Sequence, residues 1–287
     1  MIAGWHQWAD AGEVSSGLPA YLIERTGATR VGELENQGFY LFQIPGAHHL
    51  LRPSVKLSDG HRVAIEERRN EFYYSGDEAA GFLIFLGEEP HQSEERYADA
   101  FFDAAEELGV QRIAALGGVH ASVPYDRDRD ISCVYSLPSM KEELSRYAVR
   151  FSDYEGGATI TTYLADRAEA RGIEFFSLYA FVPAYNISQG TVIGHQVAIE
   201  EDAKAWYDVM RRLVHMFSLE LSLSHLARRS DELVAEWDSK VEHLSRAMPQ
   251  LGIEDYLERV REEFTERRFL PHGDLLEREL GDILLGL

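Results

Sequence analysis

The chain has 287 residues, of which 45% are hydrophobic and 11% aromatic, so it can bury a sizeable core and global disorder is excluded. It carries 28 Lys and Arg against 49 Asp and Glu, a net charge of −21 that repels nucleic-acid phosphates and anionic lipid. Its single cysteine, Cys133, excludes an intramolecular disulfide and a multi-cysteine zinc site. Because no apolar run approaches about 20 residues and no signal peptide opens the chain, we expect a cytoplasmic protein that binds neither nucleic acid nor membrane.

The N-terminal quarter of the chain contains one helical pattern and several short apolar runs. Val14, Leu18 and Leu22 recur at helical spacing after an expected first strand. The segment from about 31 to 75 has proline and Asp-Gly breaks, which are typical of antiparallel hairpins. The strands expected in it are Phe39–Phe42, Val63–Ile65 and Glu71–Tyr74.

The next part of the chain alternates strands and helices. Gly81–Gly87 and Arg112–Gly118 are short apolar runs typical of buried strands, and the stretch from Ser93 to Gly109 between them has a helical apolar face. A second helix, ended by Gly172, precedes the apolar run Phe175–Val182. This order predicts an α/β fold of three layers, with a mostly parallel sheet and helices on both faces. We assign residues 1–200 to this core domain.

Residues 201–287 form a second zone, with an almost wholly helical pattern. Its apolar stripes need a covering surface, which we expect to be the core or a neighbouring subunit. The stripes supply the expected interface residues Trp206, Met210, Leu213, Phe217, Trp237 and Val241. Leu275–Leu276 and Ile283–Leu285 predict a short amphipathic tail.

Candidate ligand-binding residues follow the expected strands, because parallel sheets bind ligands at the carboxyl ends of their strands. They are Asp10, Gly12, Glu88, Glu89, His91, Gly117, Gly118, His120 and Tyr185. The acids could work as acid and base or hold Mg²⁺, and an acidic loop beside a helix N-terminus explains them equally. The glycine pair could expose backbone N–H groups to an anion or could only form a turn.

No motif specifies a reaction. The 11 histidines lack metal-ligand spacing, and the nucleophile elbow, the dinucleotide fingerprint and the phosphate-binding loop are all missing from the sequence. Cys133 lies in an apolar setting typical of a buried, inert thiol. The sequence therefore favours a protein without catalytic residues, metal or cofactor.

Several segments, taken in order, resemble the proteasome assembly chaperone 2 family. Gly4–Gly12 is similar to that family's opening, a Gly-Trp pair followed by Asp-Ala-Gly and a helix. The further matching segments are Leu83–Pro90, Leu116–Pro124 with Arg127-Asp128, Gly156-Gly157, Ala180–Tyr185 and a helix from about Ala203, so that the resemblance covers roughly residues 1 to 235.

The resemblance implies an α/β core of the phosphorylase/hydrolase-like kind, without an established catalytic site. It also implies a non-enzymatic assembly or interaction protein, a homo-oligomer such as a trimer, and a proteasome-related partner. The sequence departs from the archaeal-type members, which end in a hydrophobic residue, a tyrosine and any residue, because it ends Leu285-Gly286-Leu287. This departure weighs against docking in the pockets of the proteasomal α-ring. The alternative is a binder of, or enzyme for, a nucleoside- or phosphate-like small molecule at the strand ends.

Overall fold

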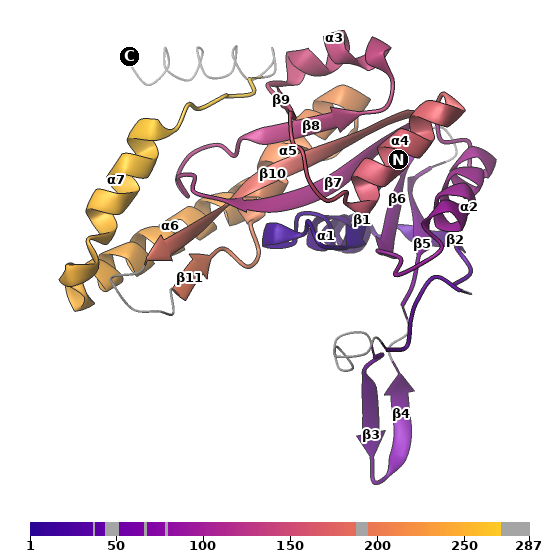
Figure 1. Cartoon of the computed structure of the whole chain (residues 1–287), viewed down its shortest axis with the longest axis horizontal. Coiled ribbons are helices and arrows are strands. Elements are labelled where there is room, and N and C mark those ends of the chain that lie inside the picture. Colours follow the sequence, from indigo (N-terminus) through magenta and orange to yellow (C-terminus); the bar gives the residue numbers. More distant parts are fainter. Residues whose placement is uncertain (37, 44–51, 66–67, 78–79, 188–194, 271–287) are drawn as a thin grey trace. The chain divides into compact units, whose positions relative to one another are not determined.

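A computed structural model describes residues 1–270 apart from 37, 44–51, 66–67, 78–79 and 188–194 (Figure 1). The expected tail segments Leu275–Leu276 and Ile283–Leu285 lie outside the described residues. The strands are β1 Ile2–His6, β2 Thr29–Glu33, β3 Val55–Ser58, β4 His61–Ile65, β5 Glu71–Gly76, β6 Gly81–Glu88, β7 Arg112–Ala121, β8 Ile131–Tyr135, β9 Arg150–Phe151, β10 Glu174–Ile187 and β11 His195–Ala198. The helices are α1 Gly17–Thr26, α2 Glu94–Glu107, α3 Lys141–Leu144, α4 Ile160–Arg171, α5 Ala203–Phe217, α6 Ser224–Ala247 and α7 Ile253–Glu263.

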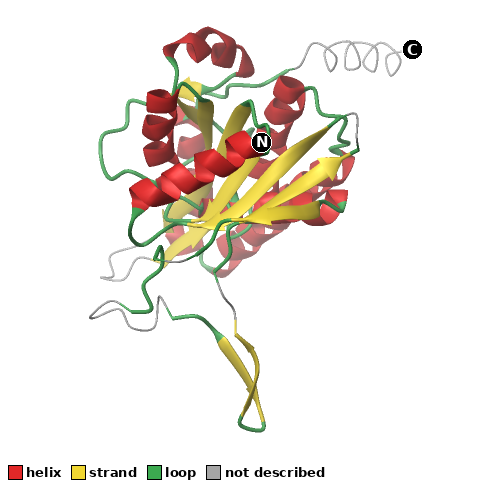
Figure 2. Cartoon of the chain, turned by 90° about the vertical axis from the view of Figure 1, so that its right-hand side faces the viewer, coloured by secondary structure: helices red, strands yellow, loops and turns green. Residues whose placement is uncertain are grey.

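Nine strands form one mixed sheet in the order β2-β5-β6-β1-β7-β10-β8-β9, with β11 paired to β10 (Figures 1 and 2). Strand β1 is parallel to both β6 and β7, and β8 is parallel to β9. The pairs β2–β5, β5–β6 and β10–β11 are antiparallel. The predicted α/β fold with a mostly parallel sheet and C-terminal helices is therefore confirmed. Strands β3 and β4 pair as a separate two-stranded sheet.

Contacts divide the chain into two compact units. The first consists of Met1–Gly118, Val134–Met140 and Asp153–Tyr179. The second consists of Val119–Cys133, Lys141–Ser152 and the chain from Ala180 onward. A self-contained domain over residues 1–200 stays a prediction. Among the described residues, no helix is both long enough and apolar enough to span a bilayer.

The first unit has helices on both faces of its strands. Side chains alternate along a strand, so successive residues of one strand face different helices. Trp5 of β1 and Phe85 of β6 belong to the apolar cluster that also contains residues of α2 and α4. Gly4 points to the other face, where an added Cβ would fall 1.8 Å from the Ser15 carbonyl oxygen at the approach to α1. Only glycine fits there, so this residue sets how closely α1 approaches the sheet.

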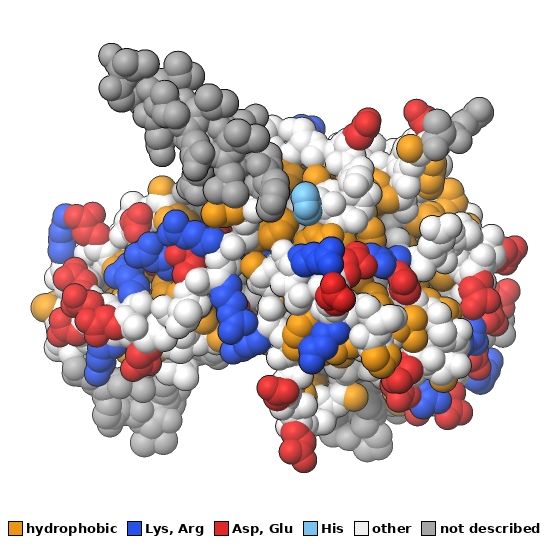
Figure 3. Space-filling view, turned by 90° about the horizontal axis from the view of Figure 1, so that it is seen from above, with side chains coloured by type: hydrophobic (Ala, Val, Ile, Leu, Met, Phe, Trp, Pro, Cys, Tyr) orange, Lys and Arg blue, Asp and Glu red, His pale blue; other side chains and the backbone are white. Residues whose placement is uncertain are grey.

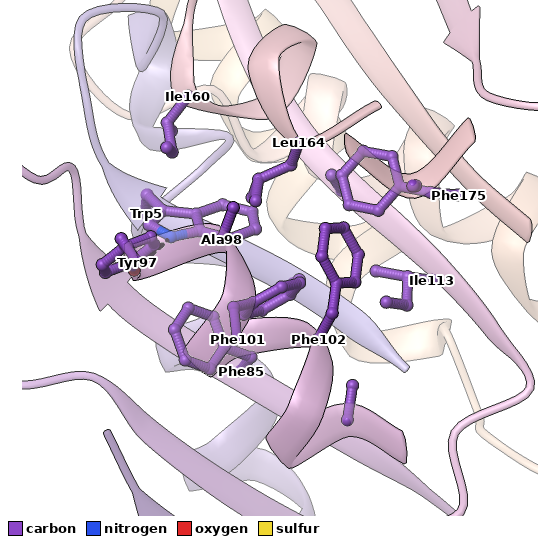
Figure 4. Packing of buried hydrophobic residues seen from close by; sticks show 14 of the residues in the cluster. Trp5, Phe85, Tyr97, Ala98, Phe101, Phe102, Ile113, Ile160, Leu164 and Phe175 are labelled. Atoms are coloured by element: carbon purple, nitrogen blue, oxygen red, sulfur yellow. Dashed lines mark hydrogen bonds between the residues drawn. The ribbon is translucent and has the colours of Figure 1, made fainter. Parts of the chain in front are cut away.

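The core of the first unit is unusually aromatic (Figure 4). The ring centroid of Phe101 on α2 lies 5.5 Å from that of Trp5 and 5.0 Å from that of Phe85. Phe102 meets Phe175 of β10 edge to face, with the ring centroids 6.1 Å apart. Aromatic pairs in such tilted arrangements stabilise a core by about 0.5–1.5 kcal/mol beyond the area they bury.

The second unit contains the C-terminal helices. Helix α5 begins at the cap residue Asp202, whose carboxylate accepts the Ala205 N–H at 2.9 Å, and α6 packs against α5. The apolar stripe of α5 is buried, as the helical periodicity predicted. Helix α7 packs in turn against α6.

One predicted strand is wrong. Phe39–Phe42 is an irregular segment, in which the Phe39 carbonyl accepts the N–H groups of His91 and Gln92. The Phe39 side chain is nevertheless buried, in edge-to-face contact with Tyr97 of α2. Its apolar character therefore reflects burial in a loop that covers α2, which an apolar run alone does not distinguish from a strand.

Candidate functional site

The strand-end cleft lies where β1 and β6 end together. These parallel neighbours pair His6 with Glu88, so the residues that follow each strand meet at one edge of the sheet. A cavity of about 420 Å³ opens there. It is lined by His6, Gln7, Asp10, Arg68, Glu88, Glu89, Pro90 and His91, all from the first unit.

Four of the nine candidate residues predicted from the sequence line this cleft: Asp10, Glu88, Glu89 and His91. Gly12, Gly117, Gly118, His120 and Tyr185 are not among its lining residues. A ligand-binding role for any of the nine stays a prediction, and their local contacts show what each does within the chain.

Asp10 anchors the entry to α1. Its carboxylate accepts the N–H groups of Ser15 at 2.8 Å and Ser16 at 3.0 Å, and it also accepts the Ser16 hydroxyl at 2.5 Å. Burial raises the pKa of the Asp10 carboxyl above its ordinary value, and these hydrogen bonds oppose the rise. The carboxylate thus satisfies backbone donors that would otherwise lack partners before a helix.

Glu89 joins two segments at the mouth of the cleft. One carboxylate oxygen accepts the Trp8 N–H at 3.0 Å, and the other accepts the Ile160 N–H at 3.1 Å. Ile160 is the first residue of α4, where a negative charge is favoured by the helix dipole. Glu89 therefore fixes the loop carrying Trp8 against the start of α4.

Glu88 and His91 also line the cleft. The Glu88 carboxylate pairs with Arg68, with 2.5 Å between Oε2 and Nη1. His91 Nδ1 accepts the Leu41 N–H at 3.1 Å, which requires that nitrogen to be unprotonated. Burial first, and then the positive charge of Arg68, lower the pKa of His91 below its ordinary value. Burial and Arg68 therefore favour the neutral imidazole over its protonated form.

A chain of hydrogen bonds runs from Trp5 in the core to the backbone of Glu88 at the cleft. Trp5 donates its indole N–H to the Tyr97 hydroxyl at 2.8 Å (Figure 4), and Tyr97 donates to Asn70 Oδ1 at 2.9 Å. The Asn70 amide donates to the Tyr40 hydroxyl at 2.7 Å, and Tyr40 donates to the Glu88 carbonyl at 3.0 Å. Each group donates to the next, so the chain fixes the backbone of Glu88 and rigidifies this part of the cleft.

Packing explains the predicted glycines. An added Cβ would lie 2.4 Å from the Tyr179 ring at Gly117 and 1.9 Å from the Ala11 carbonyl oxygen at Gly118. The Gly118 N–H donates to the Ala9 carbonyl at 2.9 Å, so that N–H is already bonded within the chain. Gly12 has φ +65°, a conformation that favours glycine. The structure thus explains Gly117 by packing against a side chain, Gly118 by close approach to the backbone and Gly12 by its positive φ.

The remaining predicted residues belong to the second unit. His120 is exposed, whereas Tyr185 is buried, donates its hydroxyl to the Val123 carbonyl at 2.8 Å and meets Trp237 edge to face. Trp206, Met210, Leu213 and Trp237 are buried within this chain, and Phe217 and Val241 are half-buried. An interface role for these six residues stays a prediction.

Sequence reasoning missed half of the cleft. His6 and Gln7 had a usable signal, since His6 ends the first strand and Gln7 follows it, and Pro90 lies between two predicted residues. Arg68 had none, because it precedes the antiparallel strand β5 and reaches the cleft only through strand pairing. Gln7 donates to Ser15 Oγ and to the Leu116 carbonyl, while its buried Oε1 has no hydrogen-bond partner among the described residues.

The second unit has its own cavity, of about 570 Å³. Its charged lining is balanced: Asp126, Asp128, Asp231 and Glu266 face Arg127, Lys204, Arg211 and Arg268. Asp128 pairs with Lys204 at 3.0 Å and with Arg211 at 3.5 Å. Because these charges largely compensate one another, the cavity offers no excess charge that would attract an ion.

The described residues contain no group of three or more His, Cys, Asp or Glu arranged to hold a metal ion. Acidic and basic side chains are interspersed on the face seen in Figure 3, with no continuous basic stripe of the kind that follows a phosphate backbone. The strand-end cleft offers carboxylate and amide groups, whose oxygens accept hydrogen bonds.

An aromatic rim lies beside the cleft. Trp8 is 72% exposed and Tyr154 is 67% exposed, so both side chains are far more exposed than tryptophan and tyrosine usually are. A Cβ added at Gly157 would lie 3.5 Å from the Trp8 ring, and one added at Gly156 would lie 2.2 Å from the Tyr154 hydroxyl. Both rings therefore lie next to the Gly156-Gly157 pair, and the Glu89 carboxylate binds the backbone N–H of Trp8.

A family model described as the PAC2 family matches residues 5–241. A search of curated proteins gave no match.

Three solved structures illustrate the structural similarity. A PAC2 family protein from Streptomyces avermitilis is 24% identical, with 89% of this chain and 98% of that chain covered and a TM-score of 0.69. A Mycobacterium tuberculosis proteasome-assembly chaperone homologue is 19% identical, with coverage of 83% and 93% and a TM-score of 0.70. Pyrococcus furiosus PbaB, an archaeal proteasome activator, is 22% identical, with coverage of 84% and 92% and a TM-score of 0.57. At these identities the likeness shows a shared fold.

Proposed function

The chain belongs to the PAC2 family, and on that premise we propose that it is a non-enzymatic interaction protein that assists assembly or activation of a proteasome-related complex. The proposal includes a cytoplasmic location and association into a homo-oligomer, for which the resemblance suggests a trimer. The names of two similar proteins, a proteasome-assembly chaperone homologue and a proteasome activator, support the choice of partner class.

The observation that carries the proposal is the exposed ring of Trp8 on a fixed backbone. Tryptophan is among the residues that contribute most to protein interfaces, and a surface that is ordered before binding loses little entropy on association. Glu89 orders the loop through the Trp8 N–H, and Tyr154 enlarges the aromatic surface. An exposed aromatic rim next to a polar cleft has the composition of an interface centre.

The test uses purified proteasome particles and their separate α-subunits, from the organism that encodes the chain, as probes. We expect the wild-type chain to bind one of them and Trp8→Ala to bind at least about 30-fold more weakly, the loss of a strong interface residue. Leu108→Ala is the matched control, because Leu108 is an apolar residue exposed at the C-terminal end of α2. Absence of binding to every probe, or equal binding by Trp8→Ala and wild type, would refute the proposal.

A second candidate function is the binding of a nucleoside- or phosphate-like small molecule. The observation favouring it is the strand-end cleft itself, which contains Asp10, Glu88, Glu89 and His91. Carboxylate oxygens in a cavity favour a ligand with N–H or O–H donors, such as a nucleobase or a sugar.

This candidate is tested by thermal shift with nucleosides, phosphate and Mg²⁺. A ligand at 100 times its Kd stabilises the folded chain by about 2.7 kcal/mol, which a melting curve detects readily. Glu88→Gln should abolish such a shift, while the control Asp231→Asn in the second unit's cavity should leave it intact. If no compound raises the melting temperature, the small-molecule function is excluded for these classes.

A further inference from the structure

Strands β3 and β4 form a hairpin whose side chains are all exposed. They are joined by Asp59 and Gly60, which have φ of 49° and 75°, as a tight two-residue hairpin turn requires. Four large aliphatic side chains face solvent: Val55 is 55% exposed, Leu57 59%, Val63 55% and Ile65 41%. So many exposed aliphatic residues in a two-stranded element are unusual for a lone surface feature.

The strand register gathers three of these residues on one face. Val55 pairs with Ile65, and residues paired across antiparallel strands point to the same side. Leu57 lies two residues after Val55 and shares that side, where it pairs with Arg62. The register shifts between Lys56 and Leu57, which leaves Val63 out of the pairing, and Lys56 pairs with Ala64 on the opposite face. We call the face with Val55, Leu57 and Ile65 the apolar face.

A hairpin of this kind needs a surface to cover it. A lone two-stranded hairpin is marginally stable in water, and its apolar face gains free energy only when another surface excludes water from it. In the part of the chain that the structure describes, β3 and β4 pair only with each other. The described residues therefore leave the apolar face of the hairpin uncovered.

The net charge of the hairpin indicates which molecule covers its apolar face. The hairpin from Val55 to Ile65 carries Lys56, Arg62 and Asp59, a net charge of +1, which leaves −22 for the rest of the chain. A cationic hairpin on a strongly acidic protein is electrostatically complementary to another molecule of the same protein. We propose that the apolar face of the β3–β4 hairpin docks on a second copy of this chain. The contact is separate from partner binding at Trp8 and does not depend on it.

The first test places a reporter on the apolar face. Leu57→Cys introduces a reactive thiol, since Cys133 is buried and burial raises its pKa to about 12, so it is not labelled in the folded chain. A polarity-sensitive fluorophore at position 57 should shift to shorter wavelength as the protein concentration rises from about 1 to 100 μM, a range that covers moderate self-association. A spectrum independent of concentration, together with a monomeric sedimentation coefficient over this range, would overturn the proposal.

The second test compares the two faces. Val55→Thr/Ile65→Thr keeps β-branched residues and changes the apolar cross-strand pair, whereas Lys56→Arg/Ala64→Ser changes the opposite pair without altering the charge. By sedimentation velocity, the first variant should self-associate at least about tenfold more weakly than wild type, and the control should match wild type. Unchanged melting temperatures would show that both fold.

The electrostatic part has its own readout. Raising the salt concentration should weaken self-association of the wild-type chain, because exposed opposite charges are screened. If both double variants associate like wild type, the apolar face is not the contact. A fluorophore shift that appears only when proteasome subunits are added would likewise reject a second copy as the occupant. Neither outcome would affect the proposed binding of a proteasome-related partner, which is tested at Trp8, whereas a chain that stays monomeric would also contradict the proposed homo-oligomer.

Discussion

The ion pair between Arg129 and Asp202 should be the most sensitive point of the second unit, and both side chains are fully buried. Arg129 Nε lies 2.8 Å from Asp202 Oδ2 and Nη2 lies 3.1 Å from Oδ1, a two-pronged pair. Asp202→Asn removes the negative charge and leaves the buried guanidinium without compensation, which typically costs about 3–5 kcal/mol. That loss lowers the melting temperature by roughly 6–20 °C for a domain of this size.

The same residue caps α5, which allows the two contributions to be separated. Asparagine accepts the Ala205 N–H as well as aspartate does, so Asp202→Asn retains the cap. Asp202→Ala removes both, and its additional cost relative to Asp202→Asn should be about 1 kcal/mol, the usual contribution of a cap. Urea unfolding followed by circular dichroism measures both differences.

The matched control is Glu142→Gln in the same unit. It also converts an acid to its amide and breaks an ion pair, with Arg146 at 3.1 Å, but these side chains are 87% and 69% exposed. Exposed pairs contribute about 0.2–1 kcal/mol or less. If Asp202→Asn destabilises the chain no more than Glu142→Gln does, the reasoning from burial is wrong.

Three further predictions follow from the first unit and from Cys133. Gly118→Ala should destabilise the chain by about 1–3 kcal/mol because the added methyl group overpacks against Ala11. The control Gly109→Ala has open space around it and should cost only about 1 kcal/mol, for its positive φ. Equal losses of stability in urea unfolding would contradict this prediction. His91 has a lowered pKa when folded and about 6.5 when unfolded, so the unfolded chain binds more protons and stability should fall as the pH drops below about 6.5. His91→Gln should flatten that dependence in melting curves between pH 7.5 and 5.5, and parallel curves would refute it. Cys133 should react with a thiol reagent only in denaturant, since it is buried and has a raised pKa; labelling of the folded chain would show that it is accessible.

The candidate site shows how far local sequence signals reach. The rule that ligands bind after parallel strands identified Asp10, Glu88, Glu89 and His91, because each follows an apolar run recognisable from the sequence. Nothing local marked Arg68, nor Asn70, which is fully buried and joins Tyr97 to Tyr40. Their positions depend on how β5 pairs with β6, and pairing between strands is a non-local choice that residue patterns do not encode.

The sequence by itself determined the alternation of strands and helices, the Asp59-Gly60 turn and the three C-terminal helices, because apolar periodicity and glycine conformations act over a few residues. Only the tertiary structure decided the sheet order, which places β6 beside β1 and so brings Glu88 next to His6 from more than eighty positions away. It also decided that Trp206 is buried while Trp8 is exposed. The physical reason is that an apolar side chain requires a cover, and which surface supplies it depends on segments distant in the sequence.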